Sequence, residues 1–397
     1  MMITKTLHII IALWAIALAC ASCSQEDITV PVSKGDGQVK IVYKVAGTSL
    51  SRAPELGWGD EDKDGTDEWH ENIINRIDLF VFHNNENKIL FKHISSTGSL
   101  GVNAESEQTF TQNELTYNDV TTGDYIYYMV VNCEFDDNDI VEGTFTLDDL
   151  KAEITPVLTF NGKQTSFAMD GKIEGAPVPV DNVVTLSFEL NRAAAKIRVS
   201  VVDKDGKSIM GQCKFRLHNY ILNGTSVLAE AESNIYGDGG WQTRVPESAN
   251  LAWNGVLRKD NQAVFYSYPN DWFDEELLIK EGEHQGEFIE EDTYAKDDLI
   301  DETKQTYIMV TYENNAYKVP VNFSISSDND KTSFTADYIE TEIRDKYYRI
   351  KRNHIYDITA TIDIVTNTVT VEKEILVNAW EDKENMDVTF GSEEEGQ

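Results

Sequence analysis

Apolar and polar residues alternate in short runs along the whole chain, and turn-forming residues separate these runs. In the first clear run, residues 38–45, the apolar Val39, Ile41, Tyr43 and Val45 are spaced two apart. Because successive side chains of a β-strand point to opposite faces, this spacing predicts a half-buried strand. Strand-like runs recur at residues 77–82, 89–93, 124–132, 183–190, 196–201, 214–222, 263–268, 306–312, 318–325 and 348–361.

Helical periodicity is not sustained over any long stretch of the sequence, and residues 147–154 alone suggest a short helix. The chain has 397 residues, which is enough for two ordinary domains, each with its own core. We therefore predict an all-β protein of two tandem β-sandwich domains, residues 53–203 and residues 204–397. The boundary is placed in the polar stretch at residues 203–208.

The end of the chain resembles its beginning. Residues 362–371 and 374–380 are strand-like, and Met386, Val388 and Phe390 then alternate with polar neighbours before a polar tail. No further element is predicted to cover these segments, so a monomer would expose them as sheet edges, which favours aggregation. We expect them to pair with another chain.

The chain is strongly acidic, with a formal net charge of −35 and an isoelectric point of about 4.4. This charge argues against nucleic acid as a partner, because binding to phosphates requires Lys and Arg. It also argues against binding to an anionic membrane surface. For most of the acidic residues the simplest interpretation is a solvated surface that keeps the protein soluble.

Residues 1–23 have the features of a lipoprotein signal peptide. Lys5 provides a positive charge, and the apolar run at residues 7–19 is shorter than the about 20 residues that span a bilayer as a helix. Small residues before a cysteine resemble a bacterial lipoprotein box, which predicts lipidation of Cys23 and anchoring in the cell outer membrane. Cys20 offers a competing frame, and secretion without a lipid is the alternative.

Catalytic motifs are absent from the sequence. There is no GxSxG, P-loop, GxGxxG or HExxH pattern, so we predict that the protein is not an enzyme. Cys133 and Cys213 are far apart, and no CxxC or Cys/His cluster follows the signal peptide. The sequence therefore indicates neither a zinc site nor a redox pair, and two buried free thiols are favoured over a single disulfide.

One acidic segment has the spacing of a calcium-binding loop. Asp60, Asp62 and Asp64 would provide oxygen ligands, Gly65 the sharp turn, and Glu71 the bidentate last ligand. However, the position that usually holds a branched aliphatic residue is acidic here, and no helix is predicted before the loop. Calcium is the one cofactor that the sequence suggests, and an acidic flexible loop is the alternative.

Several short motifs follow one another in a characteristic order. They are SRA at residues 51–53, NRIDLFVF at 75–82, YYMVVN at 127–132, RAAAKI at 192–197, RNHIY at 352–356 and VNAW at 377–380. Together with the signal peptide, these motifs resemble the Bacteroidales fimbrillins, the FimA-like and Mfa-like subunits of type V pili. The resemblance spans nearly the whole chain.

The resemblance implies two transthyretin-like, Greek-key β-sandwich domains with exchanged terminal strands. It implies export as a lipoprotein and cleavage by an arginine-specific protease between Arg52 and Ala53, which removes residues 24–52 together with the first strand. Other copies or related fimbrial subunits would then polymerise by donor-strand exchange into a fimbrium on the cell surface that supports adhesion. The donor strands would lie in residues 374–390, with the side chains Ile375, Val377, Trp380, Met386, Val388 and Phe390.

A different class of function stays open at this point. The protein could be a lipid-anchored surface protein that binds a glycan or a host ligand and never polymerises. A pilus subunit predicts a mature N-terminus at Ala53 and ladders on mildly denaturing gels. The alternative predicts an intact lipidated cysteine and a monomer.

Overall fold

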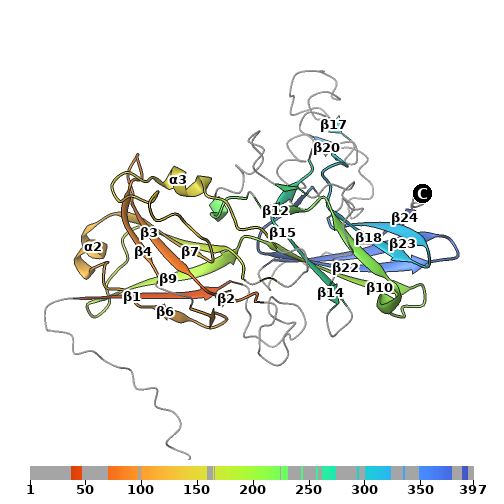
Figure 1. The fold of residues 1–397 in the computed structure, drawn as a ribbon, viewed down its shortest axis with the longest axis horizontal. Helices are drawn as coiled ribbons and strands as arrows, with labels where there is room; N and C mark the ends of the chain where they lie inside the picture. The colour runs from red at the N-terminus through yellow and green to blue at the C-terminus, as the bar shows by residue number, and fades with distance from the viewer. Residues whose placement is uncertain are drawn as a thin grey trace, which may run out of the picture.

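The computed structural model describes thirteen stretches of the chain and one single residue, and the statements below concern these parts. They are residues 37–46, 70–96, 100–158, 164, 166–223, 225–230, 243–244, 256–257, 262–273, 293–294, 300–322, 334–335, 348–377 and 387–391. For residues 222–223, 243–244, 256–257, 293–294, 334–335, 372–377 and 387–391 the backbone alone is described. Two β-rich units lie end to end along the long axis (Figure 1).

The first unit is built on a seven-stranded sheet. Its strands have the spatial order β4-β3-β7-β8-β9-β1-β6, and a two-stranded sheet, β2-β5, accompanies them. The strands are β1 (Gln38–Val45), β2 (Ile73–Ile74), β3 (Ile77–His83), β4 (Leu90–Ser95), β5 (Val102–Asn103), β6 (Gln108–Phe110), β7 (Tyr125–Val131), β8 (Met169–Glu174) and β9 (Val183–Arg192).

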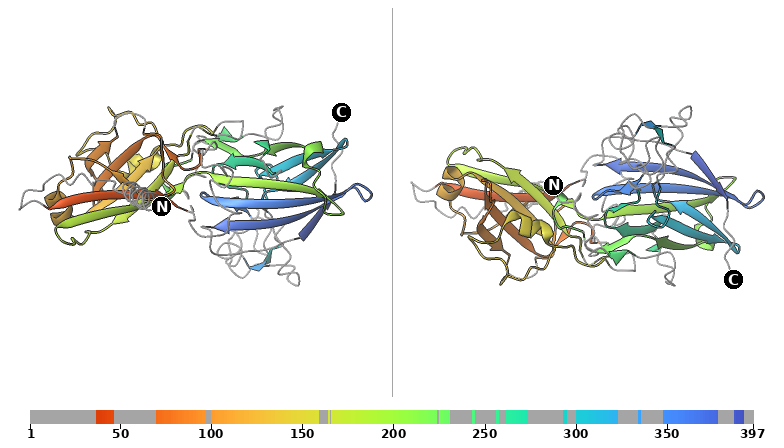
Figure 2. Two further views of the ribbon diagram at one scale, coloured as in Figure 1. Left: turned by 90° about the horizontal axis from the view of Figure 1, so that it is seen from below. Right: turned by 90° about the horizontal axis from the view of Figure 1, so that it is seen from above.

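This sheet curls on itself where β8 meets β9. The two strands pair at Met169–Arg192 and Asp170–Asn191, next to a close approach of their backbones. A Cβ atom on Gly171 would lie 2.7 Å from the carbonyl oxygen of Glu189, so the position requires glycine. The curl divides the sheet into two layers around one core (Figure 2).

Among the described residues, the α-helices α2 (Tyr117–Thr122) and α3 (Leu147–Ala152) are short and begin at capping boxes. The 3-10 helix η1 (Met210–Gln212), in the second unit, has no side-chain cap. At α3, the Thr146 side chain accepts a hydrogen bond from the backbone N–H of Asp149, whose carboxylate accepts from the N–H of Thr146. The predicted helix at residues 147–154 is thus confirmed. No helix in the described ranges has both the length and the apolar character needed to span a bilayer.

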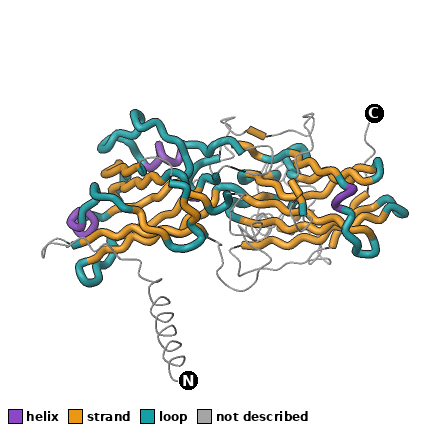
Figure 3. The backbone as a smooth tube through the Cα atoms, turned by 60° about the horizontal axis from the view of Figure 1, so that its bottom comes forward, coloured by secondary structure: helices purple, strands orange, loops and turns teal. Residues whose placement is uncertain are grey.

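The second unit packs a six-stranded sheet against a three-stranded one. Their orders are β14-β15-β10-β22-β23-β24 and β11-β18-β19, and the pairs β12-β13, β16-β21 and β17-β20 lie beside them. Figure 3 shows that strands dominate both units. The strands are β10 (Ala195–Asp203), β11 (Lys214–His218), β12 (Ile221–Asn223), β13 (Thr243–Arg244), β14 (Val256–Leu257), β15 (Ala263–Ser267), β16 (Asn270–Asp271), β17 (Thr293–Tyr294), β18 (Tyr307–Tyr312), β19 (Asn315–Pro320), β20 (Phe334–Thr335), β21 (Arg349–Ile350), β22 (His354–Asp363), β23 (Thr368–Val377) and β24 (Asp387–Gly391).

Burial follows the alternation of the sequence. Along β9, buried and exposed residues alternate almost without interruption, as they do along much of β22. In β3 and β7 nearly every residue is buried, because other elements cover the second face of the sheet there. The Phe80 ring lies 5.3 Å from that of Phe135 in the following loop, in an edge-to-face arrangement. The predicted all-β sandwich class is confirmed.

The chain enters the second sheet before the predicted domain boundary at residues 203–208. β10 pairs with β15 and β22, which both come later in the chain, so the chain enters the second unit before Ala195. The polar stretch that suggested a boundary is a turn at the end of β10. There a carboxylate oxygen of Asp203 accepts a hydrogen bond from the backbone N–H of Lys207 at 2.9 Å.

The C-terminal segments are not the uncovered strands that the sequence suggested. β23 lies between β22 and β24, and Val369 and Val371 are fully buried. β24 pairs with β23 and is the edge strand of the described sheet. The two segments therefore pair with the sheet of their own chain in this structure.

Candidate functional site

The strand β1 occupies a defined place in the first sheet, which we call the β1 slot. On one side it pairs in parallel with β9 along its whole length, and on the other side it pairs antiparallel with the three-residue strand β6 (Figure 1). Two parallel neighbours cannot be joined by a tight turn, so they are separated in the sequence. β1 is the first described strand of the unit, and its parallel neighbour β9 is the last one.

Main-chain hydrogen bonds hold both ends of β1. At its start, the Gln38 N–H donates to the Asn182 carbonyl at 2.8 Å. At its end, the Ala46 N–H donates to the carbonyl of Leu190, also at 2.8 Å. The strand is therefore tied along its length by backbone groups, which any sequence can provide.

Side chains on one face of β1 complete the core of the first unit. Ile41, Tyr43 and Val45 are each 3% exposed or less and belong to the main core cluster. Burial raises the pKa of the Tyr43 hydroxyl. Each such apolar side chain stabilises the fold by about 1.5–3 kcal/mol when it leaves water. Removal of β1 would take these three side chains out of the core and expose the apolar residues that they cover.

A fully buried arginine lies at the end of the slot. The Arg192 guanidinium donates from Nη1 to the Ala46 carbonyl at 2.8 Å and from Nε to the Glu71 carbonyl at 2.9 Å. Its Nη2 donates to the Asn72 side-chain oxygen. Arg192 therefore hydrogen-bonds to the residues at both ends of the segment between Ala46 and Glu71, and Arg52 lies within that segment.

Arg192 belongs to a buried polar group where the two units meet, which we call the junction cluster. The Glu71 carboxylate lies 3.0 Å from the ammonium nitrogen of Lys196 on β10 and accepts from the hydroxyl of Tyr266 on β15. Opposite charges removed from water are retained where they are paired and hydrogen-bonded. The cluster comprises Glu71, Asn72, Asp170, Arg192, Lys196, Tyr266, Arg352 and Asn353.

The other half of the junction cluster joins β8 to the segment before β22. Arg352 forms an ion pair with the buried Asp170 and donates to the Arg192 carbonyl at 3.2 Å. Burial raises the pKa of Asp170, and the charge of Arg352 opposes this effect. The cluster therefore links residues from both units around the end of the β1 slot.

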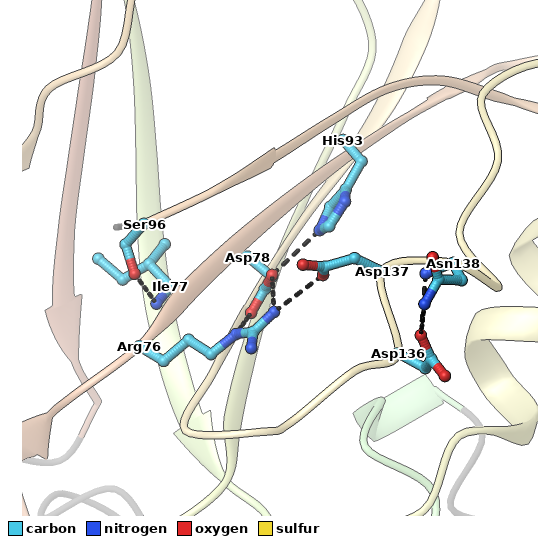
Figure 4. Close-up of polar contacts among 8 residues, drawn as sticks. All are labelled: Arg76, Ile77, Asp78, His93, Ser96, Asp136, Asp137 and Asn138. Atoms are coloured by element: carbon cyan, nitrogen blue, oxygen red, sulfur yellow. Dashed lines mark hydrogen bonds and ion pairs between the residues drawn. The ribbon is translucent and has the colours of Figure 1, made fainter. Parts of the chain in front are cut away.

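A second polar cluster lies inside the first unit, away from the slot. The buried Asp78 on β3 accepts hydrogen bonds from Arg76 at 2.7 Å and faces the ring of His93 on β4 at 3.0 Å (Figure 4). Arg76 also forms an ion pair with Asp137, and the His93 ring stacks on Phe80. This cluster joins β3 and β4 to the loop that follows β7, and we assign it a structural role.

Most sequence-predicted site residues lie outside the described residues. These are Cys23, Arg52, Ala53, Asp60, Asp62, Asp64, Trp380 and Met386. Ile375 and Val377 belong to β23, whereas Val388 and Phe390 belong to β24. The structure thus brings the predicted donor residues that it describes into two adjacent strands of the second unit.

Glu71 has partners that the sequence does not reveal. Its carboxylate contacts Lys196 and Tyr266, a different use from the calcium ligation predicted for it. Among the described residues, no group of three or more His, Cys, Asp or Glu side chains could hold a metal ion. Cys133 and Cys213 are free thiols, and burial raises the pKa of Cys213 to about 12.

The sequence around Arg192 does not indicate its role. Arg192 lies in the RAAAKI motif, beside three alanines and a predicted strand, and arginine is seldom fully buried. Its partners come from positions more than a hundred residues away, so no local pattern identifies them.

No protein-family model and no curated protein matches the chain. Solved structures do match it. The tip fimbrial protein Mfa3 of Porphyromonas gingivalis is 13% identical, with 85% of this chain and 98% of that chain covered and a TM-score of 0.47. A fimbrial assembly protein of Parabacteroides distasonis is 12% identical, with 89% and 98% covered and a TM-score of 0.43. A fimbrilin, FimA, of P. gingivalis is 12% identical, with 82% and 90% covered and a TM-score of 0.39.

These structures are fimbrial proteins by their descriptions, as are the proteins that the sequence motifs resemble. The features of this chain that bear on its function are the β1 slot and the motifs.

Proposed function

We propose that the protein is a structural subunit of a cell-surface pilus. It is exported as a lipoprotein anchored through Cys23 in the outer membrane, and an arginine-specific protease cleaves it between Arg52 and Ala53. Cleavage releases β1, and a C-terminal strand of another copy fills the β1 slot. The ordered motifs of the sequence, which resemble fimbrillins, support this proposal.

One observation carries the proposal. β1 lies entirely upstream of Arg52, yet its apolar face belongs to the core of the first unit and it pairs with strands on both sides. A strand that the fold needs and a cleavage would remove must be replaced. Strand addition provides both the main-chain hydrogen bonds and the apolar side chains that are lost.

The second unit offers a strand for this exchange. β24 pairs with β23 in the described sheet and forms its edge, whereas β23 lies between two strands. An edge strand gives up one row of hydrogen bonds when it leaves, and an internal strand gives up two. We therefore favour β24 as the donor over β23. Because the contact joins two different surfaces, repeated exchange builds an open filament.

The decisive experiment compares wild type with Arg52→Ala and Arg52→Lys in cells that express the arginine-specific protease. N-terminal sequencing of wild-type surface protein is expected to begin at Ala53, and mildly denaturing gels are expected to show ladders. Both variants are expected to keep the lipidated leader and to stay monomeric. Ser51→Ala is the matched control and is expected to assemble. Fibres formed by Arg52→Ala, or a lipidated monomer from wild type, would contradict the proposal and favour the ligand-binding alternative.

Calcium binding by Asp60, Asp62, Asp64 and Glu71 stays a proposal. Calorimetry with calcium on wild type and on Asp60→Ala tests it, because the first position of the loop pattern requires Asp, and equal heats would end it. Asp60→Ala is preferable to Glu71→Gln, because Glu71 also contacts Lys196.

A further inference from the structure

The two faces of the β1 slot differ in the side chains that they accept. On the core face the large ring of Tyr43 is 3% exposed, and aliphatic side chains flank it along the strand. On the other face Val42 is 2% exposed, although Lys40 and Lys44 on either side of it are exposed. A strand that replaces β1 must therefore bring an apolar core face and a suitable residue at the Val42 position.

The Val42 position does not suit a charge. Val42 is paired with Ser187 of β9 on one side and with Thr109 of β6 on the other, and neither carries a positive charge. On the same exposed face of β9, the residue nearest the end of the strand is the acidic Glu189. A carboxylate buried without a partner is far more costly than a hydroxyl, so threonine fits this position better than aspartate.

One register of β24 matches the core face of β1 in size. When Phe390 takes the place of Tyr43, Val388 takes the place of Ile41, so the aromatic and the aliphatic positions both correspond. Burial is the cause of the raised pKa of the Tyr43 hydroxyl, and the described part of the chain provides this hydroxyl with no hydrogen bond. Phenylalanine can therefore replace tyrosine without leaving a buried polar partner unsatisfied.

The same register also matches the outer face. Thr389 then falls at the buried Val42 position, and Asp387 falls at the position of the exposed Lys40. The charge of the donor thus remains in water. The one poorly filled position is that of Val45, which is 1% exposed and would receive Ser392.

The alternative registers fit less well. Only shifts by two residues keep the alternation of apolar side chains. A shift of two residues forward puts Phe390 where Val45 packs, puts a valine in the place of the ring, and buries Asp387 at the Val42 position. Overpacking, a cavity and a buried charge all oppose it. A shift of two residues back would bury Glu394 in the core.

We infer that Phe390 of a second copy takes the place of Tyr43 in the β1 slot, and that the Val42 position determines this register by rejecting a charge. The donor runs in the same direction as β1, which preserves the parallel pairing with β9. The inference rests on the proposed function, with β24 as the donor, and adds to it the residues that determine how the donor binds.

A substitution that improves binding provides the first test. The full chain is opened after Arg52 by limited arginine-specific proteolysis, and labelled peptides of residues 384–395 compete with the cleaved leader. Ser392→Val fills the Val45 position in the inferred register alone and is expected to tighten binding about 10- to 100-fold. Glu394→Val is the matched control, because residue 394 then lies beyond the end of β1, and it is expected to leave the affinity unchanged.

Each result decides between the inference and the proposed function. Equal affinities of the unaltered and Ser392→Val peptides, or tightening by Glu394→Val instead, overturn the inference and leave the proposed function intact. A peptide of residues 38–46 is the positive control for an accessible slot. If it binds and no β24 peptide does, both the inference and β24 as the donor fail. If no peptide binds, β1 is not replaceable and the proposed function fails with the inference.

Cross-linking measures the register directly. In the inferred register Thr389 lies opposite Ser187, whereas in the forward register it lies opposite Glu189, and both positions on β9 are exposed. A peptide with Thr389→Cys is expected to form a disulfide with Ser187→Cys at least severalfold faster than with Glu189→Cys. Adding Asp387→Leu to the peptide is expected to reduce this preference, because the forward register no longer buries a charge. Equal cross-linking by the peptide that retains Asp387 would contradict the register, and an unchanged preference with Asp387→Leu would contradict the role of the Val42 position.

Discussion

β1 and β10 hold the same position in their two sheets. Each is the first strand of its unit, and each pairs in parallel with a strand near the end of that unit: β1 with β9, and β10 with β22. Each also has an antiparallel neighbour on its other side, β6 for β1 and β15 for β10. The two units thus repeat one arrangement.

The two strands differ in how they are attached. β10 follows β9 after only Ala193 and Ala194, and five of its residues pair with β15. β1 has three partners in β6, and the chain after it leads to Arg52. Under the proposed function, cleavage after Arg52 would free β1, whereas β10 would stay joined to β9. The two strands share one topology, so the feature that bears on exchange is how each strand is attached.

The largest expected effect comes from removing the strand that would replace β1. Truncation after Trp380 deletes β24 and is expected to abolish assembly, while cleavage at Arg52 continues. Removal of residues 392–397 alone is the matched control and is expected to assemble normally. Electron microscopy and mildly denaturing gels give the readout. Normal fibres from the chain truncated after Trp380 would show that the donor lies elsewhere.

Large-to-small substitutions separate a permanent strand from a replaceable one. Ile197 on β10 and Ile41 on β1 are both buried, and Ile→Ala at such sites costs about 2–5 kcal/mol. Ile197→Ala is expected to lower the stability of both the uncleaved chain and the assembled subunit. Ile41→Ala is expected to destabilise the uncleaved chain alone, since the donor replaces it in the fibre. Thermal unfolding of both forms measures this, and equal losses in the fibre would refute the exchange.

Acid should weaken the first unit through Asp78. Burial alone would raise its pKa, but hydrogen bonds from His93, Arg76 and Ser95 outweigh burial and lower the pKa below the ordinary 3.8. A carboxyl with a lowered pKa in the folded state stabilises the fold above pH 3.8, and this contribution is lost as the pH falls through the folded-state value. Unfolding midpoints between pH 7 and about pH 2 are expected to show the loss, which Asp78→Asn should remove. An unchanged acid dependence in Asp78→Asn would exclude this carboxyl as the cause.

The alternation of single strands predicted most of the fold. Five strands begin and end within about two residues of their predicted positions: β1, β3, β7, β9 and β10. The prediction succeeds because the alternation of apolar and polar residues can be seen within each strand's own sequence. The point at which the chain passes from the first sheet to the second is not encoded in such a local pattern. Turn-forming residues at 203–208 mark a turn whether or not a domain ends there, and the true crossing is a buried run of alanines that has no turn signal.

The junction cluster could not be predicted for a related reason. Glu71 suggested calcium from its spacing, yet its partners Lys196 and Tyr266 come from strands more than a hundred residues away. Which distant polar residues meet in a core depends on the order of strands, and a single sequence does not encode that order locally. Arg192 contacts the end of β1 only because β9 turns out to be the parallel neighbour.

The smallest effect is expected at the surface of the same strand pair. Lys44 of β1 and Glu189 of β9 are partners in the parallel register, with Nζ and Oε1 3.9 Å apart and side chains 54% and 61% exposed. An ion pair so open to water and salt contributes about 0–1 kcal/mol. Lys44→Ala is therefore expected to leave the unfolding midpoint of the uncleaved chain nearly unchanged, with little dependence on salt. If this variant were as destabilised as Ile41→Ala, then exposed charges rather than buried apolar side chains and backbone pairing would retain β1. In that case a donor strand would have to supply a lysine, and β24 has glycine at the corresponding position, Gly391.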